Sequence, residues 1–198
     1  MRHHLISCTL ALVLLIGLSP RLVTATTVQR FGIDQLAANA AHIFVGRCTA
    51  ATPELAHGQI YTRFEFDVED VLKGAATRKI EVSLAGGVLQ GVEYRIVGMP
   101  TFHPGERVVL FLTEKDAHGN AWPVGLGQGK FAIDAGPTDR SARVRQSLSS
   151  GVNLLTLGGD LAAKPVVGKL DASGMQLAEF LSLVRSLVDK DEGGADAR

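Results

Sequence analysis

Histidines and carboxylates beside turns are the residues of this sequence best suited to metal chemistry. His103 with Glu106, and Asp116 with His118, can each supply two ligands to a divalent ion. The sequence has no His-Glu-x-x-His motif and no pair of histidines four residues apart, the spacing that directs two imidazoles of one helix to one ion. Polar residues at turns need no ligand to explain them, so we expect neither a metal nor another cofactor. A metal-dependent hydrolase built on His103, Glu106 and His118 is the enzymatic alternative.

Candidate nucleophiles lack the neighbours that would activate them. Cys48 ends the stretch Phe44–Cys48, which reads as a strand. A reactive thiolate needs a cationic or helix-terminal environment and a histidine partner, so we expect Cys48 to be a buried structural thiol. No Gly-x-Ser-x-Gly motif is present, and Ser147, Ser149 and Ser150 have no histidine nearby in sequence. A triad can still assemble from distant segments, but we identify no catalytic residue.

The glycine-rich stretch Gly125–Lys130 does not match a phosphate-binding loop. That motif requires glycine where this sequence has Val124, and serine or threonine where it has Phe131. We therefore expect these glycines to lie where strands bend.

The most regular strand pattern covers residues 59–71. Ile60, Thr62, Phe64, Phe66 and Val68 alternate with Tyr61, Arg63, Glu65, Asp67 and Glu69. Strict alternation predicts an antiparallel strand with one buried and one solvated face. The three carboxylates of this strand lie about 7 Å apart, a spacing that paired acid catalysis can use, but their alternation with core positions favours a solvated face.

The other elements follow from periodicity and turn residues. A helix is expected at 33–41, and further strands at 42–49, 80–84, 92–96, 107–112, 122–126 and 130–133, with turns at 52–54 and 57–58. The 107–112 strand is apolar on both faces from Val108 onward, which predicts a central position. Residues 134–170 show mixed loop and turn character. A last helix, capped by Asp171 or Ser173, runs to about Val188 with a wide apolar face, and the charged tail 191–198 is expected to be disordered.

Together these elements predict a mostly β (α+β) fold. We expect a small antiparallel OB-like barrel of five or six strands, closed or partly open, with a short N-terminal helix and a packed C-terminal helix, forming one domain over residues 26–190.

The N-terminal residues have the three parts of a cleavable secretory signal. A basic start, Met1 to His4, precedes the apolar stretch Leu5 to Leu18, which is shorter than the roughly 20 residues of a spanning helix. Small residues at positions 23–25 predict cleavage after Ala25. The product would be periplasmic or secreted, with no membrane insertion after cleavage.

The charge of the mature chain argues against nucleic acid as a partner. Loss of Arg2 and Arg21 with the leader leaves 18 basic side chains against 20 acidic ones, a net charge near −2. This charge gives no electrostatic basis for binding nucleic acid.

Cys48 is the one cysteine that remains after cleavage, so the mature chain can form no internal disulfide. The hydrophobic core must therefore stabilise the mature chain. Nothing in the sequence specifies an oligomeric state.

Four segments resemble an uncharacterised family of exported bacterial proteins. They are Ala40–Arg47, Tyr61–Gly74, Ile80–Gly87 and Phe102–Leu112. The same order is similar to the netrin-like domains of metalloprotease inhibitors, and this resemblance implies an OB-type barrel over roughly residues 40–133. Those inhibitors begin with a metal-chelating cysteine, whereas this mature chain would begin with Thr26, so the resemblance implies the fold and not the inhibition.

We therefore expect an exported, non-enzymatic binding module whose partner is another exported protein or an envelope component. OB barrels bind through one exposed strand face and its loops. The predicted binding residues lie on the solvated face of the 59–71 strand and in the loop 99–105; they are Tyr61, Arg63, Glu65, Asp67, Phe102 and His103. A structural accessory to a secreted enzyme is a further alternative.

Overall fold

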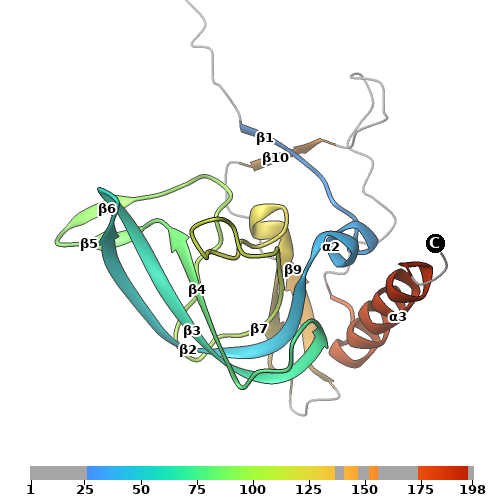
Figure 1. The fold of residues 1–198 in the computed structure, drawn as a ribbon. Helices are drawn as coiled ribbons and strands as arrows, with labels where there is room; N and C mark the ends of the chain where they lie inside the picture. The colour runs from blue at the N-terminus through green and yellow to red at the C-terminus, as the bar shows by residue number, and fades with distance from the viewer. Residues whose placement is uncertain (1–25, 137–140, 147–151, 156–173, 196–198) are drawn as a thin grey trace, which may run out of the picture.

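The computed structural model describes residues 26–136, 141–146, 152–155 and 174–195. Six strands form one curved antiparallel sheet in the order β4-β3-β2-β7-β8-β9 (Figure 1). Their bounds are β2 His42–Ala56, β3 Gln59–Lys73, β4 Lys79–Ala85, β7 Arg107–Leu112, β8 Lys130–Asp134 and β9 Arg143–Gln146. The mostly β prediction is confirmed for the described residues.

Smaller elements surround this sheet. β1 (Thr26–Gln29) pairs in parallel with β10 (Val152–Leu155), and β5 (Gly87–Leu89) forms a hairpin with β6 (Val92–Tyr94). The helices are α2 (Ile33–Asn39), the 3-10 helix η1 (Leu126–Gly129) and α3 (Leu177–Ala195). The short N-terminal helix is thus confirmed within two residues of its predicted end.

The central strands bury both faces because a separate core lies on each side of the sheet. Val109 and Phe111 of β7 pack with α2 and α3 in one core. Val108 and Leu110 of the same strand pack with Phe102 in the other core. This arrangement confirms the central position predicted for residues 107–112.

The last helix presents its predicted apolar face to the sheet. Phe180 is fully buried, with its ring centroid 4.8 Å from that of Phe131 on β8. The predicted bounds are wrong, because α3 begins at Leu177 and continues to Ala195, so residues 191–195 are helical. Lys73 on β3 forms an ion pair with Asp191 of α3 at 3.1 Å. This ion pair holds a helical turn in the segment that composition alone predicts to be disordered. The predicted caps Asp171 and Ser173, and residues 196–198, lie outside the described residues.

The first long hairpin is longer than predicted. β2 continues through Pro53 to Ala56, and the reversal occurs at His57–Gly58, so the turn predicted at 52–54 is wrong. Proline is tolerated there because, among the described residues, β2 has no partner strand on its other side beyond Cys48. No ladder bond to a described strand therefore needs the missing N–H.

Two other strand predictions need correction. At 122–126 only Pro123 forms an isolated bridge, and the chain then turns through Gly125 and Leu126, whose φ angles are 62° and 61°. The strand predicted at 92–96 ends at Tyr94 and pairs with β5, outside the main sheet. Within 134–170 the structure contains β9 and β10, which no sequence pattern predicted; residues 137–140, 147–151 and 156–170 of that range lie outside the described residues.

The sheet is not closed into a barrel in the described part of the chain, since β4 and β9 form its two separate edges. The β9 edge is covered by the residues that lead into α3. Val144 donates its N–H to the Met175 carbonyl at 3.0 Å, and Leu177 donates to the Ala142 carbonyl at 2.8 Å. The β4 edge borders a groove. Among the described residues, no helix has the length and apolar composition needed to cross a membrane.

Candidate functional site: a groove beside the open edge of the sheet

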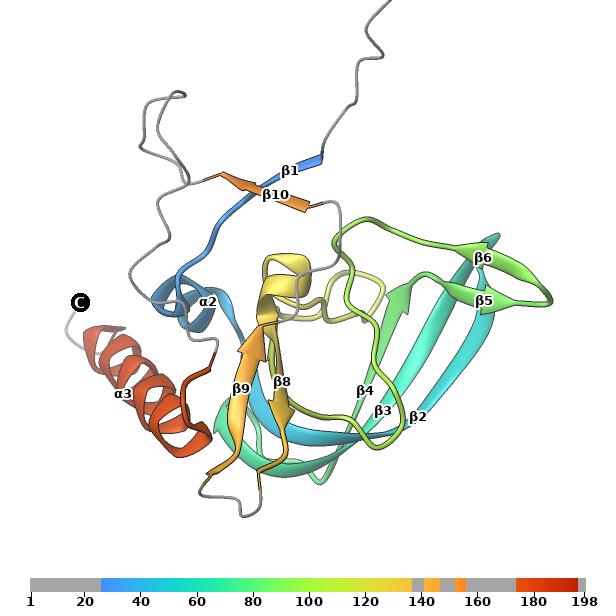
Figure 2. The same ribbon diagram turned by 180° about the vertical axis from the view of Figure 1, so that it is seen from behind.

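A groove of about 410 Å³ is lined by residues of β3 and β4 and by residues of the connecting segment 95–106, which joins β6 to β7. Figure 2 shows the path of this segment beside β4. The imidazole-bearing residue His103 contributes to its wall. Most of its other side chains are apolar and include Phe64, Leu84, Ile96, Val97, Met99 and Pro100. The groove can therefore accept a few aliphatic side chains of a ligand.

Two glycines separate the β5–β6 hairpin from β4 and so leave space for the groove. Gly86 and Gly87 have φ angles of 120° and 140°, a region that side chains disfavour. A Cβ at Gly87 would lie 2.3 Å from the Thr62 hydroxyl oxygen, which donates a hydrogen bond to the Gly86 carbonyl at 2.7 Å. The hairpin direction therefore depends on both glycines.

The outer edge of β4 carries unpaired backbone groups. Gly86 donates its N–H to the Ile60 carbonyl at 2.8 Å, and this pair fixes which residues of β4 bond to β3. Because the pattern alternates in an antiparallel ladder, the residues bonded to β3 are Ile80, Val82 and Leu84. The N–H and C=O groups that point away from the sheet belong to Glu81, Ser83 and Ala85, and within the described residues they have no partner. We call these three residues the open β4 edge.

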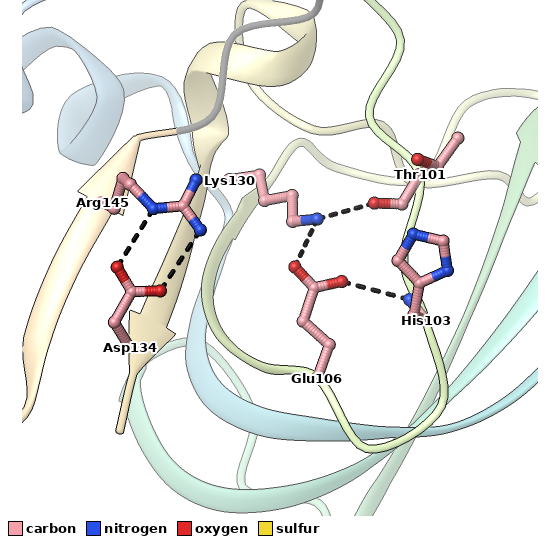
Figure 3. Close-up of polar contacts among 6 residues, drawn as sticks. All are labelled: Thr101, His103, Glu106, Lys130, Asp134 and Arg145. Atoms are coloured by element: carbon pink, nitrogen blue, oxygen red, sulfur yellow. Dashed lines mark hydrogen bonds and ion pairs between the residues drawn. The ribbon is translucent and has the colours of Figure 1, made fainter. Parts of the chain in front are cut away.

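A buried lysine fixes the opposite wall of the groove (Figure 3). The Nζ atom of Lys130, whose side chain is 7% exposed, lies 2.6 Å from Glu106 Oε1 and donates to the Thr101 carbonyl at 2.6 Å. It also lies 4.6 Å from the centroid of the Phe102 ring. The second Glu106 oxygen accepts the backbone N–H of His103 at 3.1 Å. The connecting segment is thus bound to β8, whereas no hydrogen bond joins its described residues to the outward groups of β4.

Two carboxylates face each other on the outer surface of the same edge. Glu65 on β3 and Glu81 on β4 are direct cross-strand partners, an arrangement that is unfavourable for like charges. Neither has an ion-pair partner in the part of the chain that the structure describes. The neighbouring pair, Asp67 and Lys79, is 3.9 Å apart and exposed. The surface beside the open β4 edge therefore has uncompensated negative charge.

Exposed apolar side chains lie near the mouth of the groove. Val88 and Val97 line it and are 57% and 44% exposed, and Val92 in the same hairpin is 61% exposed. Leu55, at the tip of the β2–β3 hairpin, is 68% exposed. Burial of these side chains by a partner would be favourable.

The structure divides the predicted binding residues between two faces. Tyr61, Arg63, Glu65 and Asp67 lie on the outer side of β3, as their alternation predicts. His103 lines the groove on the inner side. Phe102 is 2% exposed, because it packs against Phe64 and Phe66 with ring centroids 5.0 Å away, so its prediction as a binding residue is wrong. The open β4 edge lies between the two faces.

The residues of the metal-dependent alternative are engaged elsewhere. Glu106 binds Lys130 and His103, as described above. His118 lies beside His57, with 6.4 Å between ring centroids, and Asp116 accepts the indole N–H of Trp122 at 3.0 Å. The described residues contain no group of three or more histidine, cysteine, aspartate or glutamate side chains able to hold a metal ion.

Cys48 is buried, as predicted. Its thiol donates a hydrogen bond to the Ala50 carbonyl at 3.4 Å. Burial raises the pKa of the Cys48 thiol, and the negative charge of Glu106 raises this pKa further. The thiol therefore stays protonated at neutral pH, which is unfavourable for a nucleophile.

A second cleft of about 360 Å³ lies where β7 begins and β8 ends. Its arginines are paired with carboxylates: Arg145 with Asp134 at 3.0 Å, and both Arg107 and Arg47 with Glu69 at 2.6 and 3.5 Å. An anionic ligand would have to compete with these carboxylates. The groove beside β4 is the better candidate site, because the outward backbone groups of that strand have no partner among the residues that the structure describes.

Sequence reasoning missed Glu81, Ser83, Ala85 and Lys130. The alternation in β4 specifies which side chains face the core, but the strand's position at an edge depends on which strands pair with it. Lys130 ends the glycine-rich stretch Gly125–Lys130 and begins the strand predicted at 130–133. A lysine at the start of an otherwise apolar strand was the one available signal for a buried charge.

No protein-family model matches the chain, and no curated protein sequence shows significant similarity to it.

Proposed function

We propose that this chain is an exported, non-enzymatic module that binds another exported protein. One observation carries the proposal: an apolar groove lies directly beside a strand edge whose outward backbone groups have no partner among the described residues. Both features are costly for an isolated domain, since apolar surface and free edges favour association. A binding partner would compensate for both.

The proposed cellular location rests on the N-terminal sequence. Cleavage after Ala25 would leave β1, which begins at Thr26, in the mature chain. The mature protein would then act in the periplasm or outside the cell.

The proposed architecture is a partly open OB-like barrel. The curved six-stranded sheet, with Phe102 filling its inner face and a helix packed on its outer side, supports this assignment. The resemblance of residues 40–133 to netrin-like domains, which rests on the sequence pattern alone, is the second reason for this proposal. Such barrels bind ligands through an exposed strand face and adjoining loops, which here are β3, β4 and the connecting segment 95–106.

Site-specific crosslinking tests the proposed function. The photoreactive amino acid p-benzoylphenylalanine, placed at Val97 on the groove rim, should crosslink in living cells to one discrete exported protein, identified by mass spectrometry. The same amino acid at Ser182, exposed on α3, is the matched control and should give no such product. The identified protein, purified separately, should bind the mature chain reversibly.

Two outcomes would contradict the proposal. A crosslinking pattern that does not differ between Val97 and Ser182 would remove the groove as a binding surface. Stoichiometric zinc in the purified mature protein, lost in His103→Ala, would favour the hydrolase alternative instead. A product at Val97 that proves to be a secreted enzyme would identify the module as an accessory to that enzyme.

A further inference from the structure

We infer that the partner binds by strand addition: an extended segment pairs antiparallel with the open β4 edge, with apolar side chains toward the groove and a basic side chain opposite Glu81. This inference rests on the proposed function and specifies the chemistry of the partner.

The backbone of β4 specifies an extended ligand. Glu81, Ser83 and Ala85 present donors and acceptors at the repeat of one strand, which only another extended backbone matches. The other edge of the sheet shows the same kind of pairing, since β9 bonds to the residues before α3. Within the described ranges of the chain, the β4 edge therefore lacks a neighbour that the β9 edge has.

Side-chain alternation then divides the ligand between two environments. In a strand beside β4, every second side chain would lie on the inner side, over Leu84 and Met99 and within the groove. The intervening side chains would lie on the outer side, beside Glu81 and Ser83. The groove thus requires apolar residues at alternate positions.

The charge on the outer face selects the intervening residues. Glu81 and Glu65 oppose each other without an ion-pair partner in the described residues, so a lysine or arginine opposite Glu81 would relieve this repulsion. The basic residue is the element of charge complementarity that distinguishes this ligand from any apolar strand.

The enclosure of the edge favours a single extended segment over a second copy of this chain. Ala85, at the upper end of the edge, is only 6% exposed, and the groove beside it is bounded by the connecting segment. A folded sheet would have to displace that segment, which Lys130 holds to β8. A single strand can enter without that displacement.

A designed peptide provides the first test. An acetylated, amidated peptide of alternating valine and lysine, with a fluorophore at one end, is titrated with the mature protein. The matched peptide with glutamate in place of lysine should bind about fivefold more weakly at low salt, and Glu81→Lys should reverse this preference. Methylation of the lysine backbone nitrogens, which would face β4, should abolish binding, whereas methylation of the valine nitrogens should not.

A proline substitution tests the edge from the side of the protein. Ser83→Pro removes one outward N–H and leaves the bonds between β4 and β3 intact, because Ser83 does not bond to β3. It should weaken peptide binding at least about tenfold, while Ser83→Ala, which keeps the N–H, should bind normally. Circular dichroism and the unfolding midpoint of both variants confirm that the fold is retained.

The outcomes separate this inference from the proposed function. If the partner crosslinks at Val97 but its binding is unchanged by Ser83→Pro, strand addition is wrong and the groove binds in another way. If Glu81→Lys leaves the peptide preference unchanged, the basic residue is wrong. If light scattering shows a doubled mass for the mature protein, and the peptides bind only to this dimer, the β4 edge is occupied by a second copy of this chain. If no partner crosslinks at all, the proposed function itself fails.

Discussion

At the scale of single residues, the buried ion pair between Lys130 and Glu106 determines how the connecting segment is held. The two partners differ in exposure: the side chain of Lys130 is 7% exposed and that of Glu106 is 21% exposed. Loss of the carboxylate would leave a buried cation without its counter-charge, whereas loss of the amine would leave a carboxylate that water can reach.

This asymmetry predicts unequal effects of two substitutions. Glu106→Gln should lower the free energy of unfolding by about 2 to 3 kcal/mol, and Lys130→Met by about 1 kcal/mol. The double variant should be no less stable than Glu106→Gln alone, because the uncompensated charge is then removed. Urea denaturation of the mature protein measures all three values, and an equal or reversed order of the single variants would contradict this account of the pair.

Asp116 and Trp122 provide a pH-dependent reporter at the same scale. The hydrogen bond from the Trp122 indole, followed by backbone hydrogen bonds from Asn120 and His118, lowers the pKa of Asp116 below its ordinary value. A lowered pKa in the folded state means that this carboxylate stabilises the loop above its unfolded pKa, and that the contribution is lost as the pH falls through the folded pKa.

Trp122 is the single tryptophan of the chain, so its fluorescence reports this titration directly. The emission should stay constant as the pH falls through the ordinary aspartate range and should change only below it. Asp116→Asn should abolish the transition. A transition at or above the ordinary aspartate pKa, with unchanged circular dichroism, would show that the hydrogen bond is absent in solution.

At the scale of elements, α3 contributes to the stability of the sheet. Phe180 is fully buried against Phe111 and Phe131, so Phe180→Ala should reduce the free energy of unfolding by about 3 to 5 kcal/mol. Ser182→Ala, on the exposed side of the same helix, should change it by less than about 0.5 kcal/mol. Thermal unfolding of both variants makes the comparison, and a small effect of Phe180→Ala would mean that α3 does not pack on the sheet in solution.

The elements also show what the sequence could predict. Strict alternation identified β3, continuous apolarity identified the central β7, and a wide apolar stripe identified α3. Each of these patterns reports burial, which the sequence encodes locally. The path of β2 through Pro53 was mispredicted because proline is excluded only where a neighbouring strand needs its N–H, and the neighbours of a strand are set by the whole sheet.

The candidate site depended more strongly on such long-range pairing. Glu65 was predicted to lie on a solvated face, and it does, but its opposition to Glu81 follows from the register of β3 and β4. His103, which the sequence places in the loop 99–105, lines the groove. Phe102 in the same loop lies in the core, because the connecting segment folds back onto Phe64 and Phe66.

At the scale of the whole molecule, the two edges of the six-stranded sheet differ in their backbone pairing. The β9 edge is paired with the chain leading into α3, whereas the outward backbone groups of β4, next to an apolar groove, have no partner in the part of the chain that the structure describes. A protein with one free edge is prone to association unless that edge is short, charged or occupied. Here the edge is short and bears Glu81, which is compatible with a free form that persists until its partner arrives.

Amide hydrogen exchange at β4, followed by nuclear magnetic resonance, shows whether β4 is an open edge that accepts a partner strand. In the free protein the amides of Ile80, Val82 and Leu84, which bond to β3, should exchange slowly, and those of Glu81, Ser83 and Ala85 should exchange faster. Saturation with the crosslinked partner, or with the valine–lysine peptide, should protect the second set and leave the first unchanged. Protection of Glu81, Ser83 and Ala85 in the free protein, or no change in their exchange at saturation, would contradict the claim that β4 is an open edge to which a partner strand is added.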